Sequence, residues 1–146
     1  MKKLILIVIF VLTQCGYQPI HLNNNSKNFE FNKITYQGNS KINKKIINVL
    51  SLKENRSDKN LNDLSLKSYY EIKETKKNSK GRVVSYRSKI NLNLIIKNNN
   101  QVIANKDFVR EFSYNTKDNK FDLIQYQNEI KKNLIDEIIE DIILFM

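Results

Sequence analysis

The feature that most constrains the fold is a run of strict two-residue alternation in the second half of the chain. Mostly apolar side chains recur at every second position from Val84 to Ile96, and Arg87, Lys89 and Asn91 lie between them. Successive side chains of a β-strand point to opposite faces of its sheet. The run therefore predicts a long strand with one buried face and one polar face.

Apolar periodicity predicts the other elements of the domain. They are a strand over 29–37 closed by Gly38, a helix over 40–53, strands over 64–72 and 101–115, and a helix over 122–144. The phase of the last strand breaks near Lys106 and Asp107, which predicts a β-bulge there. The order β-α-β-β-β-α predicts an α+β two-layer sandwich, with a four-stranded, mostly antiparallel sheet covered on one face by two helices. Its other face is expected to be polar and to carry Lys67, Glu71, Lys73, Arg87, Lys89 and Asn91.

The N-terminal segment has the pattern of an export signal. Lys2 and Lys3 precede nine apolar residues, Leu4–Leu12, which make about 14 Å of helix against the ~30 Å of a bilayer core. The next residues, 12–15 (LTQC), resemble the lipobox of bacterial lipoproteins, in which the cysteine is acylated and the peptide is cut before it. Gln14 departs from that pattern, because the position usually holds a small residue. A simple signal peptide and an uncleaved short anchor are the alternatives.

We accordingly divide the chain into a signal peptide (1–14), a lipidated Cys15 with a tether (15–28), and a single α+β domain (29–146). The residue after the cysteine is Gly16, and not the aspartate that resembles an inner-membrane retention signal. By that analogy the mature protein lies in the outer membrane, anchored by lipid on its periplasmic side.

Charge is distributed unevenly along the chain. The 25 Lys and Arg against 15 Asp and Glu give a net charge of +10. Residues 121–146 carry two lysines and six acidic side chains, whereas residues 15–120 carry 21 basic and nine acidic ones. The densest basic cluster surrounds the predicted hairpin tip at 76–82 and comprises Lys73, Lys76, Lys77, Lys80, Arg82 and Arg87. Phosphate or carboxylate groups are natural ligands of such a cluster, and a solubilising edge is the alternative.

Composition argues against catalysis and against metal or cofactor binding. One Cys and one His do not supply a disulfide or a zinc site, and three glycines form no phosphate-binding loop. Tyr69, Tyr70 and Tyr86 beside Arg87 offer a stacking platform for nucleic acid. The export signal argues against nucleic acid as a partner.

Two short motifs and the element order resemble the lipopolysaccharide-assembly lipoprotein family, LptE. The motifs are Cys15–Pro19 (CGYQP) and Arg110–Asn115 (REFSYN), the second standing before the long terminal helix. The resemblance implies a lipid-anchored, non-enzymatic protein that plugs the LptD β-barrel of the lipopolysaccharide translocon, assists barrel assembly and binds lipopolysaccharide near its phosphates. The basic hairpin tip as the binding site is a hypothesis from charge alone. The alternative function is an envelope scaffold lipoprotein with no lipopolysaccharide contact.

Overall fold

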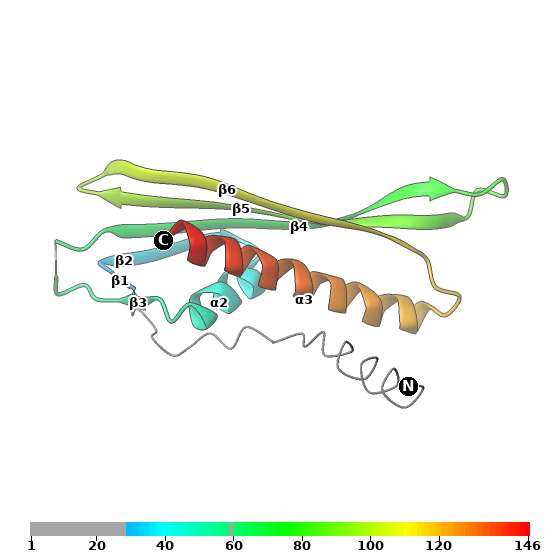
Figure 1. Ribbon diagram of the computed structural model, residues 1–146, viewed down its shortest axis with the longest axis horizontal. Coiled ribbons are helices and arrows are strands. Elements are labelled where there is room, and N and C mark those ends of the chain that lie inside the picture. Colours follow the sequence, from blue (N-terminus) through cyan, green and yellow to red (C-terminus); the bar gives the residue numbers. More distant parts are fainter. Residues whose placement is uncertain (1–28, 59) are drawn as a thin grey trace, which may run out of the picture.

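Two helices pack against one face of a four-stranded sheet (Figure 1). This computed structural model describes residues 29–58 and 60–146, so the predicted signal peptide, Cys15 and tether lie outside the described residues. The elements are β1 (Glu30–Phe31), β2 (Lys33–Gly38), α2 (Ser40–Val49), β3 (Lys53–Glu54), β4 (Asp63–Lys77), β5 (Val83–Asn98), β6 (Gln101–Asn115) and α3 (Lys120–Phe145).

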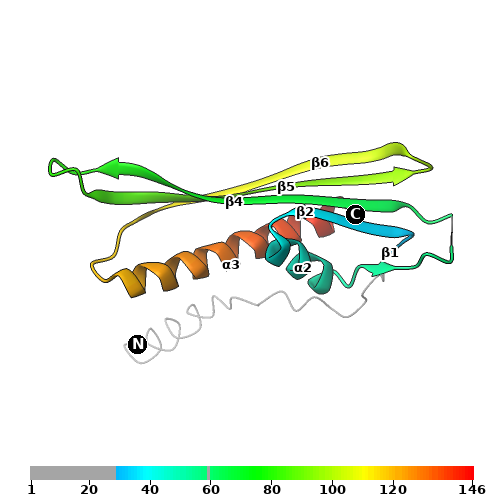
Figure 2. The same ribbon diagram turned by 180° about the vertical axis from the view of Figure 1, so that it is seen from behind.

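The sheet has the strand order β2-β4-β5-β6. β2 runs parallel to β4, while β4, β5 and β6 form an antiparallel meander. Helix α2 lies in the connection between the two parallel strands, as a parallel pair requires a crossover. Seen from either side, α2 and α3 lie on the same face of the sheet (Figures 1 and 2). The predicted α+β sandwich is confirmed, and the two-residue strands β1 and β3 are additions to the predicted element order.

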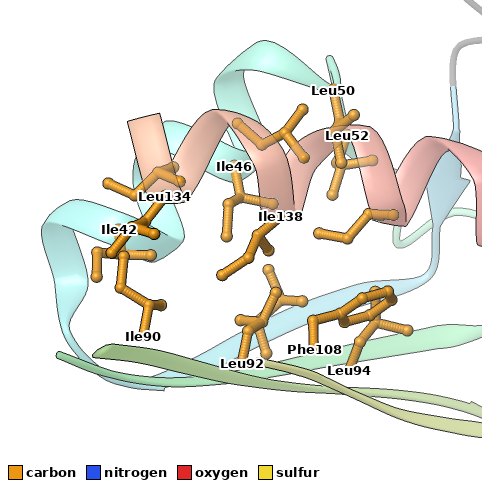
Figure 3. Close-up of a cluster of buried hydrophobic side chains, with 14 of the residues drawn as sticks. Ile42, Ile46, Leu50, Leu52, Ile90, Leu92, Leu94, Phe108, Leu134 and Ile138 are labelled. Atoms are coloured by element: carbon orange, nitrogen blue, oxygen red, sulfur yellow. The ribbon is translucent and has the colours of Figure 1, made fainter. Parts of the chain in front are cut away.

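The core lies where both helices meet the first half of β4 and the middle of β5 (Figure 3). Alternate residues of β5, Ile90, Leu92 and Leu94, are almost fully buried. Ile46 of α2 and Ile138 of α3 reach down to them from the helix layer. The apolar residues that recur at every second position of the strands and at every third or fourth position of the helices thus pack into one layer.

Truncation of this layer is expected to destabilise the domain strongly. Ile138 is 0% exposed, so Ile138→Ala removes buried methyl groups and leaves a cavity, at a cost of about 2–5 kcal/mol in the free energy of unfolding. Urea unfolding followed by circular dichroism measures this change. Ile143→Ala, on the same helix at a 37% exposed position, is the control and should cost less than about 1 kcal/mol. Equal losses in the two variants would contradict this location of the core.

The predicted strand over 29–37 and helix over 40–53 differ from the structure in extent. The strand is interrupted at Asn32, because β1 pairs with β3 whereas β2 pairs with β4. The helix ends at Val49, and Ser51 adopts a positive φ of 50°. That turn brings Leu52 back to the core, where it is buried, and places β3 beside β1. The helix was predicted too long because apolar residues continue the helical spacing in the sequence beyond the point where the backbone turns.

The β-bulge predicted near Lys106 and Asp107 is wrong. Pairing of β6 with β5 is continuous through these residues, and the register shift lies opposite Ile96 and Lys97. Lys106 lies on the helix-facing side of β6, opposite Leu94, and its side chain is nonetheless exposed. Because β6 is an edge strand with partial cover, a lysine on its helix-facing side reaches water without a change of register. The final helix is longer than predicted and begins at Lys120, with the side chain of Asn119 accepting a hydrogen bond from the Phe121 N–H at 2.8 Å.

Candidate functional site

The predicted basic cluster lies on the β4–β5 hairpin, whose turn projects past both helices in the two views (Figures 1 and 2). Lys73, Lys76 and Lys77 end β4, while Lys80 and Arg82 lie in the turn. Arg87 lies on β5 directly opposite Lys73. All six side chains are exposed. The structure therefore brings the six residues together on one arm that the core does not cover.

A hydrogen-bonded turn holds the tip of this arm in shape. The Asn78 side-chain oxygen accepts from the backbone N–H groups of Lys80 and Arg82, each at 3.0 Å. The Asn78 N–H donates to the Arg82 carbonyl at 2.9 Å, and the Gly81 N–H donates to the Asn78 carbonyl at 3.0 Å. Gly81 has a φ of 74°, a conformation that favours glycine. An asparagine side chain that mimics a backbone turn thus presents Lys80 and Arg82 from a defined backbone.

Three of the six cations are already paired with carboxylates. Lys73 lies 3.3 Å from Glu71, and Lys77 lies 3.1 Å from Glu74. Arg87 lies 3.4 Å from Glu111 of β6 and donates from Nε to the Ser113 hydroxyl at 3.2 Å. These exposed pairs are weak, worth about 0–1 kcal/mol each.

The other three cations, Lys76, Lys80 and Arg82, have no carboxylate partner among residues 29–58 and 60–146. Lys76 lies at the register shifts near the end of β4, and Lys80 and Arg82 lie in the turn that follows, so all three belong to the end of one hairpin. A cluster of uncompensated ammonium and guanidinium groups attracts phosphate, and arginine can bind it through two parallel hydrogen bonds. Lys76, Lys80 and Arg82 are therefore the strongest candidates for anion contact.

The face of the sheet turned away from the helices is polar, as the sequence predicts. Lys67, Asn93 and Asp107 lie side by side across β4, β5 and β6. The Asn93 amide donates to Asp107 at 2.8 Å and to Asn105 at 2.8 Å. Neither helix covers this face (Figure 1). Rows of polar side chains that run across the strands are therefore exposed on this face.

The stacking platform considered for nucleic acid does not exist in the structure. Tyr69 and Tyr70 are neighbours on β4 and point to opposite faces. The Tyr70 hydroxyl lies 3.3 Å from the buried Ser88 hydroxyl, and burial raises the pKa of Tyr70. Tyr86 stacks on Tyr114 with ring centroids 5.9 Å apart. Tyr70 and Tyr86 thus pack within the domain.

A second region, at the seam between β6 and α3, was not predicted as a site. Arg110 of β6 pairs with Asp141 at 2.6 Å and with Glu137 at 3.5 Å, both on α3. Hollows on either side of this bridge lie between the strand and the helix. The sequence signal was the acidic stripe of the last helix, but only the fold shows that Arg110 lies opposite it.

The described part of the chain has neither a candidate metal site nor a candidate membrane-spanning helix. Residues 29–58 and 60–146 contain no group of three or more His, Cys, Asp or Glu side chains placed to hold a metal ion. None of the helices in this part of the chain combines the length and the apolar character of a membrane span.

Comparison with known proteins shows the fold of a group of bacterial lipoproteins. Rare lipoprotein B from Shewanella oneidensis is similar, with a TM-score of 0.59 at 9% identity, over 78% of this chain and 92% of that one. A minor lipoprotein from Acinetobacter baumannii has a TM-score of 0.55 at 12% identity, over 78% and 89% of the two chains. Lipoprotein B from Nitrosomonas europaea has a TM-score of 0.57 at 12% identity, over 86% and 88%.

No sequence-family profile and no curated protein matches the chain. The similarity is thus one of fold, and it extends over most of each protein. The predicted resemblance to a family of bacterial lipoproteins is thus confirmed at the level of the fold.

Proposed function

We propose that this protein is an outer-membrane lipoprotein of the lipopolysaccharide translocon, anchored through Cys15 on the periplasmic side. In this role it plugs an LptD-like β-barrel, assists assembly of that barrel and binds lipopolysaccharide during its insertion. The observation that carries the proposal is a fold shared with bacterial lipoproteins over 78% or more of this chain, in a sequence whose lone cysteine follows an export signal.

The polar face of the sheet supports the plug role. The lumen of a large outer-membrane barrel is lined by polar groups and water. A sheet with polar rows on its uncovered side can enter such a lumen without exposing its apolar core, which lies between the sheet and the helices. The proposed role needs binding and positioning but no bond chemistry, which agrees with a chain expected not to be an enzyme.

The basic hairpin supports contact with lipopolysaccharide. The phosphate groups of lipid A match the uncompensated cations Lys76, Lys80 and Arg82 at the tip. Lys73, Lys77 and Arg87 form only exposed ion pairs, so they can exchange a carboxylate for a phosphate at little cost. We therefore assign all six to the proposed binding surface, with the three tip residues making the principal contacts.

Affinity isolation of the tagged protein from gently solubilised outer membranes tests the proposal. Mass spectrometry of the bound partners should identify a large β-barrel, and the N-terminal peptide should begin at an acylated Cys15. Cys15→Ser should remove the acyl groups, because serine has no thiol to carry them, and the N-terminal peptide should then carry no lipid mass.

Two other outcomes would contradict parts of the proposal. An acylated Cys15 without a barrel would contradict the translocon role and favour the envelope scaffold. An unmodified Cys15 would contradict the anchor.

A further inference from the structure

Strand β6 is a long edge strand of the sheet, which among residues 29–58 and 60–146 pairs on one side only, with β5. It is 15 residues long and stands last in the strand order, whereas β2 at the opposite edge has six residues. A long exposed edge offers a row of backbone N–H and C=O groups to another strand, and proteins ordinarily shorten or cover such edges. The sheet is therefore open to extension on one side.

The register shows which residues of β6 face outward. The Thr116 N–H donates to the Val84 carbonyl at 3.0 Å, so residue 116 directs its backbone groups toward β5. Because these directions alternate in an antiparallel pair, the odd-numbered residues from Asn105 to Ser113 direct theirs toward the free edge. Accordingly, the Arg110 guanidinium reaches the Val109 carbonyl at 3.4 Å.

Two hollows lie along this edge, on the helix side. One, of about 550 Å³, is lined by Phe108, Leu144 and Phe145 among others. The other, of about 160 Å³, is lined by Phe112, Tyr126, Ile130 and Leu134 among others. Phe108 and Phe112 are four residues apart, or roughly 13 Å along the strand. An added strand with apolar side chains at positions i and i+4 would place one in each hollow.

The charged side chains at the seam between β6 and α3 favour one kind of added strand over another. The two hollows are lined by two basic and four acidic side chains: Lys106, Arg110, Asp107, Glu129, Glu137 and Asp141. Arg110 is already engaged by Glu137 and Asp141. On the polar face of the same strand lie Asp107 and Glu111, of which Glu111 is also 3.4 Å from Arg87. The seam thus favours a basic segment over an acidic one, although the chain as a whole is positive.

We propose that β6 binds an extended, basic segment of a partner protein as an added strand. Backbone hydrogen bonds to Asn105–Ser113 supply affinity, and apolar side chains at i and i+4 fill the two hollows. Lysine or arginine at i+1 and i+3 points to the opposite face, beside Asp107 and Glu111. A small polar residue at i+2 passes over Arg110. This inference does not depend on the proposed function, since it rests on β6 and α3 alone.

Binding of a defined peptide to the purified full chain in mild detergent tests the proposal. The probe is the fluorescent nine-residue peptide TKLKTKLKT, which has leucines at i and i+4 and lysines on the opposite face. Fluorescence anisotropy should show saturable binding, and the matched acidic peptide TELETELET should bind at least about tenfold more weakly. Val109→Pro removes one outward N–H and should weaken the basic peptide about fivefold or more. Val109→Thr keeps that N–H and should bind like the wild type.

Three outcomes would overturn the proposal. Equal binding of the basic and acidic peptides would show non-specific adsorption. Equal binding by the Val109→Pro and Val109→Thr variants, both with unchanged circular dichroism, would show that the β6 edge is not used. Concentration-dependent dimerisation in sedimentation experiments that Val109→Pro abolishes would identify a second copy of this chain as the occupant. A failed peptide experiment leaves isolation with a barrel unaffected, so the two proposals fail separately.

Discussion

Gly38→Ala is expected to lower the free energy of unfolding by about 3–5 kcal/mol, among the largest effects available to one methyl group. Gly38 ends β2 with a φ of 80°, and an added Cβ would lie 2.0 Å from the backbone carbonyl oxygen of Ser68. That carbonyl accepts the Asn39 N–H at 2.9 Å. Neither group can withdraw without separating β2 from β4 or disturbing the N-cap of α2. Urea unfolding followed by circular dichroism measures the loss.

Gly81→Ala is the matched control for this prediction. Gly81 has a similar φ of 74°, but an added Cβ there meets nothing within 4 Å. Its expected cost is therefore the backbone term alone, about 1–2 kcal/mol. The difference between the two variants isolates the steric clash with Ser68. If both variants lost the same stability, the close approach of β2 to β4 at this point would be wrong.

Reversing the three uncompensated charges of the hairpin tip is expected to weaken lipopolysaccharide binding about a hundredfold. The variant is Lys76→Glu, Lys80→Glu and Arg82→Glu. If each exposed cation contributes roughly 1 kcal/mol to phosphate contact, three together correspond to about two orders of magnitude in affinity. The fold should be unaffected, because all three side chains are exposed and none has an ion-pair partner in the described part of the chain. Titration with labelled lipopolysaccharide at two salt concentrations measures the change.

The control variant carries the same change of net charge at another place. Lys33, Lys44 and Lys53 are exposed on β2, α2 and β3, and their reversal to glutamate should reduce affinity only a few-fold through the long-range field. Salt should weaken wild-type binding, since exposed charges are screened. If the tip variant retained full affinity, the hairpin would not be the binding surface. If the two triple variants lost affinity equally, overall charge and not the tip would govern binding.

The elements that the sequence predicted well are those whose pattern is long and local. The alternation of β5 and the helical stripe of α3 each extend over more than twelve residues, so one misplaced side chain does not change the interpretation. Short elements were predicted less well. The two residues of β3 and the break at Asn32 depend on pairing between β1 and β3, which are more than twenty residues apart.

The candidate site shows the same division. The basic hairpin could be found from the chain because its six cations are close in sequence and Asn78 and Gly81 mark the turn. The sequence does not show which of these cations are paired with a carboxylate. The pairing of Arg87 with Glu111, for example, depends on the register of two strands. Tyr69, Tyr70 and Tyr86 looked like one surface, but strand alternation and the buried Ser88 hydroxyl place two of them within the domain.

Local chemistry in the chain was sufficient to specify the strand and helix faces, the class of fold, the basic arm and the candidate lipid anchor at Cys15. These follow from spacing over a few residues, which the backbone geometry of each element converts directly into a face or a turn. Packing in three dimensions was required to define the α3–β6 seam. Arg110 meets Asp141 although the two are 31 positions apart in the sequence, and the hollows beside them are lined by residues of both β6 and α3. The spacing of residues along the chain does not predict such distant contacts, because they depend on how all the elements pack around the core.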